Sequence, residues 1–163
     1  MSHRSNMSAA EIAQYKSRFR IDNSMDDTAQ PMKDTPKRYR EICDYFQYLA
    51  TEALAADFPF IREVDRLIVF PISEEVRLGI DGQCQDRNNT CTIALSESLM
   101  LFSHGVEYSL MVYLHELAHV KEHNHSDSFG ELLDRMIAAF NKKHKYNIHN
   151  DFYDNKKANV RKT

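Results

Sequence analysis

The sequence has no apolar segment long enough to span a membrane. None of its hydrophobic runs approaches the roughly 20 residues that a helix needs to cross a bilayer. Its opening stretch, MSHRSNMSAAEIAQYKSRFR, also lacks the apolar segment that a secretion signal carries between its charged start and its cleavage site. These absences exclude a membrane-spanning protein and predict a cytoplasmic location.

Cysteine is scarce as well. The chain has three cysteines, Cys43, Cys84 and Cys91, and their spacing matches no common disulfide or zinc-binding framework. Such an odd set suits a reducing compartment, so we expect reduced, structural thiols. With 163 residues, of which 42% are hydrophobic and 28% charged, the chain fits one globular domain and hence one functional site.

The net charge of −3 is unevenly distributed. Residues 142–163 carry +5 and residues 1–141 carry −8, which gives an acidic body and a basic tail. A basic run permits contact with nucleic-acid phosphates, but it is more often a solvated chain end, so a nucleic-acid partner is not favoured. The basic residues of this region are Lys142, Lys143, Lys145, Lys156, Lys157, Arg161 and Lys162.

Hydrophobic periodicity predicts the helices of an α+β fold. Apolar residues over 37–56 recur at steps of three and four, which indicates an N-terminal core helix. After a short helical turn over 97–102, the same period returns over 106–123. A last helix should begin near Ser126 or Ser128, because Ser128 and Glu131 have the spacing of a capping box.

Three short runs between these helices favour strands. They cover residues 67–70, 75–80 and 90–95, and the polar stretch 81–89 between the last two is typical of a turn. We therefore expect a small antiparallel sheet of about three strands. The predicted organisation is a flexible leader over 1–34, with a short helix around 12–19, a domain over 35–145, and a basic polar tail over 146–163.

The strongest functional signal is HELAH, residues 115–119. Two histidines four residues apart on a helix project side by side, so that one zinc ion can bind both. Glu116 follows the first histidine directly, where its carboxylate can take a proton from a zinc-bound water that attacks a peptide carbonyl. This pattern predicts a zinc-dependent metallopeptidase with Glu116 as its catalytic base.

A catalytic zinc needs a third protein ligand, and we predict His125. Three ligands in a row on one straight helix would climb about 12 Å, so the third must return from beyond a turn. Asn124 favours such a turn. Three acidic residues downstream remain rival ligands: Asp127, Glu131 and Asp134. For the function, a non-catalytic, zinc-stabilised binding module remains an alternative.

The motif with its downstream histidine resembles the SprT-like, WLM-domain and YgjP-like group of small zinc metallopeptidases over about residues 65–140. The resemblance implies a zincin-like domain whose zinc ligands are His115, His119 and His125 and whose base is Glu116. It also implies a protein or peptide substrate aligned along the strand at 92–96, and SprT-like relatives act on DNA-associated proteins. ImmA-like regulatory peptidases, an alternative, take a downstream glutamate, which would point to Glu131.

Several nearby residues have weaker claims. Gly130 departs from the resemblance, because these families usually carry Trp or Tyr after the position of Phe129. Tyr108 lies on about the same helical face as His115 and is a candidate oxyanion donor, although a core or rim tyrosine is the commoner case. His104 and His123 are expected to be surface residues.

Overall fold

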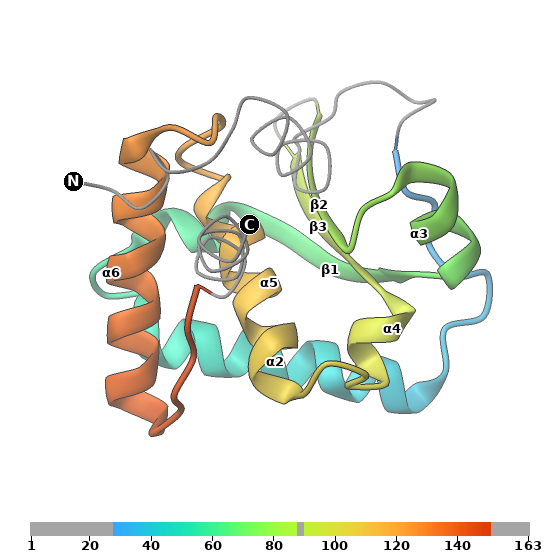
Figure 1. Cartoon of the computed structure of the whole chain (residues 1–163), viewed down its shortest axis with the longest axis horizontal. Coiled ribbons are helices and arrows are strands. Elements are labelled where there is room, and N and C mark those ends of the chain that lie inside the picture. Colours follow the sequence, from blue (N-terminus) through green and yellow to red (C-terminus); the bar gives the residue numbers. More distant parts are fainter. Residues whose placement is uncertain (1–27, 88–89, 151–163) are drawn as a thin grey trace, which may run out of the picture.

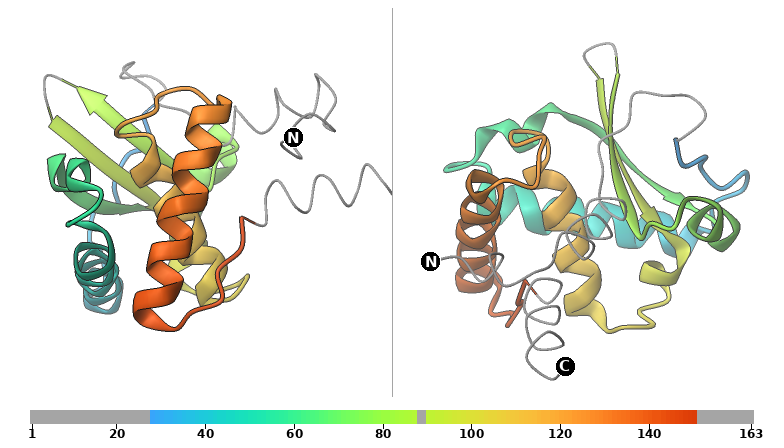
Figure 2. Two further views of the ribbon diagram at one scale, coloured as in Figure 1. Left: turned by 90° about the vertical axis from the view of Figure 1, so that its left-hand side faces the viewer. Right: turned by 45° about the horizontal axis from the view of Figure 1, so that its top comes forward.

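The computed structural model describes residues 28–87 and 90–150, which form an α+β domain (Figure 1). The three long helices, α2 (Lys37–Leu54), α5 (Val106–Ala118) and α6 (Asp127–His144), pack on one face of a small sheet, with α6 standing against α2 and α5 (Figures 1 and 2). The short helix α3 (Ile72–Leu78) packs with Ala29 on the opposite face. Among the described residues, no helix has the length and apolar character needed to cross a membrane. The elements are α2 (Lys37–Leu54), η2 (Pro59–Glu63), β1 (Val64–Phe70), α3 (Ile72–Leu78), β2 (Gly82–Arg87), β3 (Thr90–Ser96), α4 (Glu97–Met100), α5 (Val106–Ala118) and α6 (Asp127–His144).

The sheet has the strand order β1-β3-β2 and is mixed. β3 pairs antiparallel with β2 but parallel with β1, so the prediction of an antiparallel sheet is right for only one of the two pairs. The parallel pair arises because α3 and β2 intervene between β1 and β3 and return the chain to its starting direction. β3 is therefore the central strand, and the expectation that a substrate aligns along 92–96 is wrong, since both edges of this strand are occupied.

The predicted strand over 75–80 is instead helix α3. Pro71 precedes the helix, and Glu74 in its first turn binds Arg77 at 2.8 Å, an i,i+3 pair that supports a helix. Gly79 ends it with a left-handed φ of 67°, a conformation that glycine adopts without strain. These local interactions outweigh the strand preference of Val76 and Ile80.

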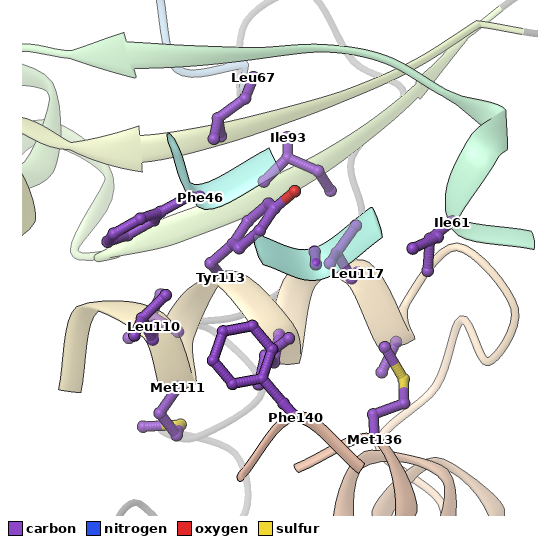
Figure 3. Close-up of a cluster of buried hydrophobic side chains, with 14 of the residues drawn as sticks. Phe46, Ile61, Leu67, Ile93, Leu110, Met111, Tyr113, Leu117, Met136 and Phe140 are labelled. Atoms are coloured by element: carbon purple, nitrogen blue, oxygen red, sulfur yellow. The ribbon is translucent and has the colours of Figure 1, made fainter. Parts of the chain in front are cut away.

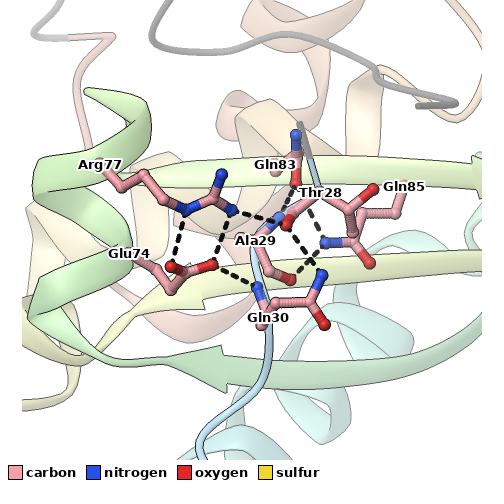
Figure 4. A network of polar contacts seen from close by, with 7 residues as sticks. All are labelled: Thr28, Ala29, Gln30, Glu74, Arg77, Gln83 and Gln85. Atoms are coloured by element: carbon pink, nitrogen blue, oxygen red, sulfur yellow. Dashed lines mark hydrogen bonds and ion pairs between the residues drawn. The ribbon is translucent and has the colours of Figure 1, made fainter. Parts of the chain in front are cut away.

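The predicted turn over 81–89 contains strand β2. Its polar sequence conceals the strand, because Gln83 and Gln85 are buried by contact with the backbone of Ala29 (Figure 4). The Ala29 amide donates to Gln83 Oε1 at 2.9 Å, and Gln85 Nε2 donates to the Ala29 carbonyl at 3.0 Å. The amides thus hydrogen-bond to the backbone of a segment remote in sequence, an interaction that no local pattern reveals.

The same contacts place part of the predicted leader in the folded domain. Thr28 and Ala29 are buried, and the Met32 amide donates to the Val69 carbonyl at 2.9 Å. At the other end, Ile148 is buried and bonded to Asn141, although it falls in the predicted tail. The packed chain therefore extends beyond 35–145 in both directions, whereas the helix expected around 12–19 lies outside the described residues.

The main core lies between the sheet and the three long helices (Figure 3). Helix α5 is its centre, since every residue from Ser109 to Ala118 is buried, as expected of a helix covered on all sides. The inner residues predicted for the last helix are buried as well; they are Phe129, Leu132, Leu133, Met136, Ile137 and Phe140. Phe46 of α2 packs against Tyr113 of α5, with ring centroids 5.9 Å apart.

We predict that Phe46→Ala lowers the free energy of unfolding by about 3–5 kcal/mol, because it removes a fully buried aromatic ring and leaves a cavity. Urea denaturation followed by circular dichroism measures this loss. Val76→Ala is the control, because Val76 is 77% exposed and its truncation should change stability by less than about 0.5 kcal/mol. Equal effects of the two substitutions would contradict the assignment of this core.

Candidate metal centre

Two of the predicted ligands lie at the carboxyl end of α5. His115 is in the last turn of the helix, and His119 is its C-cap with helical dihedral angles of −65° and −19°. The four-residue spacing therefore acts as it would inside the helix, and both side chains are fully buried. The helix ends at Ala118, five residues before the predicted end at His123.

A tight turn follows and brings the third histidine back. The amides of Val120 and Lys121 bond to carbonyls three residues earlier, at 3.1 Å each, which narrows the end of the helix. His125 then approaches both other rings, with its Nε2 atom 3.2 Å from Nε2 of His115 and 3.0 Å from Nε2 of His119. The turn, which we predicted at Asn124, thus begins earlier, at His119. As predicted, it brings His125 back to the other two histidines.

The start of α6 supports this arrangement. Ser126 is the N-cap, and its Oγ accepts the Phe129 amide at 3.3 Å, so the cap is Ser126 and the predicted capping box of Ser128 and Glu131 is wrong. The cap places the ring of Phe129 against all three imidazoles. It stacks on His119 at a centroid distance of 4.4 Å and meets His115 and His125 edge-on at 4.8 and 5.2 Å.

The three histidines suit a single divalent metal ion. Their ligating nitrogens all lie within 4.8 Å of one another, and two ligands about 2.05 Å from a tetrahedral zinc would be about 3.3 Å apart, close to the distances from His125. His119 Nδ1 lies 3.0 Å from the Glu122 carbonyl, which favours a proton on Nδ1 and directs Nε2 to the metal. Burial and the neighbouring imidazoles lower the pKa of His115, which keeps it in the neutral, metal-binding form.

Glu116 is the second unusual feature of the site. It is fully buried, yet neither carboxylate oxygen has a hydrogen-bond partner among the described residues. Burial and the nearby Cys91 raise its pKa well above the ordinary value. A buried carboxylate without partners is costly, which indicates a role in binding or chemistry that the protein alone does not satisfy.

Gly82, which the sequence analysis placed in a turn, makes room for this carboxylate. It is the first residue of β2 and lies directly against α5. A Cβ atom at this position would be 2.9 Å from Cγ1 of Val112 and 3.2 Å from both Cγ and Oε2 of Glu116. Only a glycine lets β2 approach α5 this closely. In the sequence, the one sign of this contact is a glycine at the start of a polar stretch.

The rival residues do not join the histidine cluster. Among the described residues, the only group of three or more possible ligands consists of the three histidines. Glu131 is exposed on α6, which removes the ligand that an ImmA-like site would need, and Asp127 and Asp134 also stay outside the cluster.

The aromatic and histidine candidates near the motif have other contacts. The Tyr108 hydroxyl donates to Asp81 Oδ2 at 2.7 Å, so it supports the start of β2, and the structure gives no support to an oxyanion role. His104 packs edge-on against Tyr108, at a centroid distance of 5.2 Å. His123 is half exposed, as expected of a surface residue, with Nε2 4.0 Å from Asp86 Oδ2.

A cavity of about 340 Å³ adjoins the cluster and shares His119 with it. Strand β2 provides Cys84 and Asp86 to its lining. The polar sequence around these two residues is the reason why a turn was predicted there. The Sγ atoms of Cys84 and Cys91 lie 3.4 Å apart in its wall, and all three cysteines are free and buried. The other lining residues are Glu63, Thr90, Val120 and His123.

A comparison with known protein families gives a match for this region. Residues 82–147 match the family described as YgjP-like, metallopeptidase domain. The matched segment extends from β2 through α6 and includes all three histidines and Glu116. The match confirms the resemblance to the YgjP-like group and supports a metallopeptidase. No curated protein and no solved structure matches the chain.

We predict one divalent metal ion per chain and at least tenfold weaker binding in His125→Ala, because two histidines of one helix then remain. Elemental analysis after dialysis against a weak chelator measures the ratio of metal to protein. His104→Ala is the control, since His104 is exposed and outside the cluster. Undiminished metal content in His125→Ala would remove His125 from the site.

Proposed function

We propose that this chain, with a YgjP-like metallopeptidase domain over residues 82–147, is a zinc-dependent peptidase that hydrolyses peptide bonds. His115, His119 and His125 hold the zinc, and Glu116 is the catalytic base. The observation that carries the proposal is the placement of a buried, unpartnered carboxylate directly after the first residue of a three-histidine cluster. Zinc fits this donor set, because three imidazole nitrogens with an open fourth position are a common catalytic site for it.

The chemistry divides between the metal and Glu116. A bound zinc ion acts as a Lewis acid that polarises the substrate carbonyl and lowers the pKa of water. The Glu116 carboxylate accepts the proton of the attacking water and then delivers it to the nitrogen of the leaving amine. Gly82 keeps the carboxylate in place by excluding any side chain from the strand beside it.

The substrate would lie beside β2, the edge strand of the described sheet nearest the site. This strand contacts Glu116 at its first residue, and Cys84 and Asp86 line the cavity next to His119. An extended peptide on this side would run past the metal, in the way that peptides add to sheet edges in other proteins. We therefore place the substrate along β2 and not along 92–96, because 92–96 belongs to the central strand.

A non-catalytic zinc module is the alternative. Such a module would close the metal site with a fourth protein ligand, and no fourth ligand joins the cluster within the described residues.

The proposal that the substrates include DNA-associated proteins rests on the SprT-like resemblance alone. Of the basic tail, Lys142 and Lys143 lie in the last turn of α6 and Lys145 follows as its C-cap, whereas the rest lies outside the described residues.

We predict that Glu116→Gln lowers the rate of peptide hydrolysis at least about a hundredfold, because an amide cannot accept the proton. Cleavage of an unfolded protein such as reduced casein, followed by mass spectrometry, measures the loss. Elemental analysis should find the metal retained, because Glu116 is not one of the clustered ligands. Retained metal with no Glu116-dependent cleavage in the wild type would favour the zinc module.

We predict that Gly82→Ala lowers kcat about tenfold or more while the metal remains bound. The added Cβ lies too close to Val112 and Glu116, so the carboxylate must shift from its position. Gly79→Ala is the matched control: its φ of 67° also strains an alanine, but nothing lies within 4 Å of the new Cβ. If both variants lose equal activity, general destabilisation explains the loss and the positioning role of Gly82 is wrong.

A further inference from the structure

The cavity beside His119 has a composition suited to one kind of substrate side chain. Its most buried lining residues are Cys84 and His119, which are fully buried, and Cys91, which is 7% exposed, while Val120 is partly buried. Apart from His119, which belongs to the metal cluster, these residues present sulfur and hydrocarbon and no fixed charge. The exposed lining as a whole is more polar than apolar, but a flexible aliphatic chain would find apolar contacts on the two cysteines and Val120.

The mouth of the cavity is acidic. Glu63 is exposed, and the side chain of Asp86 is 43% exposed, so both carboxylates lie at the solvent side of the lining. Both carboxylates and Cys91 line this one cavity. Among the described residues that line the cavity there is no lysine or arginine, and of its two histidines His119 belongs to the metal cluster and His123 lies 4.0 Å from Asp86.

The position of the cavity relates it to the reaction. His119 contributes both to the metal cluster and to the cavity wall, so a side chain in the cavity belongs to a residue close to the metal. β2, which supplies Cys84 and Asp86, is also the strand along which we place the substrate. The metal, β2 and the cavity would thus contact neighbouring residues of one bound peptide.

We propose that this cavity binds the side chain of a lysine or arginine next to the cleaved bond, and that Glu63 and Asp86 select the positive charge. Cys84, Cys91 and Val120 pack against the methylene groups of such a side chain, and the carboxylates at the mouth bind its cationic end. The proposal rests on the proposed peptidase function and adds a substrate class to it. The volume of about 340 Å³ accommodates a long side chain.

The test uses internally quenched peptides of constant Ala/Ser sequence in which a single Lys, Gln or Glu occupies each position in turn. Mass spectrometry locates the cleaved bond. Wild-type protein should cleave at a fixed offset from Lys, with kcat/KM about two- to fivefold above the Gln peptide, the size expected for a partly exposed charge pair. In the isosteric double variant Glu63→Gln, Asp86→Asn the Lys-to-Gln ratio should fall to about one.

Glu41→Gln is the matched control, because Glu41 is an exposed acid on α2 whose ion pair is with Lys37; it should keep the wild-type ratio. Charge reversal in Glu63→Lys should shift the preference toward the Glu peptide. Cleavage that depends on Glu116 but shows no preference for Lys, or a preference unchanged in the double variant, would overturn the pocket assignment and leave the peptidase intact.

A binding measurement separates the two proposals if no peptide is cleaved. Fluorescence anisotropy with the Glu116→Gln protein and labelled Lys and Gln peptides reports affinity without turnover. Tighter binding of the Lys peptide, lost in the triple variant that also carries Glu63→Gln and Asp86→Asn, supports the pocket even where the peptidase proposal fails. Equal binding of both peptides refutes the pocket.

Discussion

The burial of α5 between the sheet and α6 is the constraint on which the candidate centre depends. A helix buried on all sides from Ser109 to Ala118 cannot rotate or slide without disrupting the core on every face. His115 and Glu116 are part of this buried segment, so their directions are fixed by the same packing that stabilises the domain. Precise placement of metal ligands and of a base requires such rigid support.

The same constraint explains why the sheet matters to the site. β2 can reach Glu116 only because Gly82 has no side chain, and Tyr108 of α5 bonds to Asp81 just before it. On the opposite face of the sheet, Gln83 and Gln85 fix the strand to the backbone of Ala29. The strand is therefore held from both sides, and a segment far upstream in sequence contributes indirectly to the position of the carboxylate.

The sequence predicted those parts of the protein that depend on local periodicity. The helices α2 and α6, the strands predicted at 67–70 and 90–95 within β1 and β3, and the meeting of His115, His119 and His125 all follow from short-range spacing. It failed where distant contacts decide. Buried Gln83 and Gln85 look like turn residues until Ala29 is placed against them, and the apolar residues of α3 look like a strand until Pro71, Glu74 and Gly79 are weighed together.

The cavity beside His119 illustrates the same limit. Its lining comes from η2, β2, β3 and the turn after α5, so no motif in the sequence joins Glu63 to Asp86. The family resemblance locates the reacting groups, because these lie within a short segment with fixed spacing. The substrate selection that we propose instead depends on side chains that only the tertiary fold brings together, so no local motif could have predicted it.

The size of the core bears on whether the metal serves the fold or the chemistry. Small zinc modules need their metal because they bury too little apolar surface to fold alone. Here a continuous core of side chains from α2, the sheet, α5 and α6 adjoins the site, and Phe129 packs against the three imidazoles. We therefore expect this domain to hold its helices together without the metal. The cost of burying an unpartnered Glu116 is therefore better explained by catalysis than by a structural zinc site.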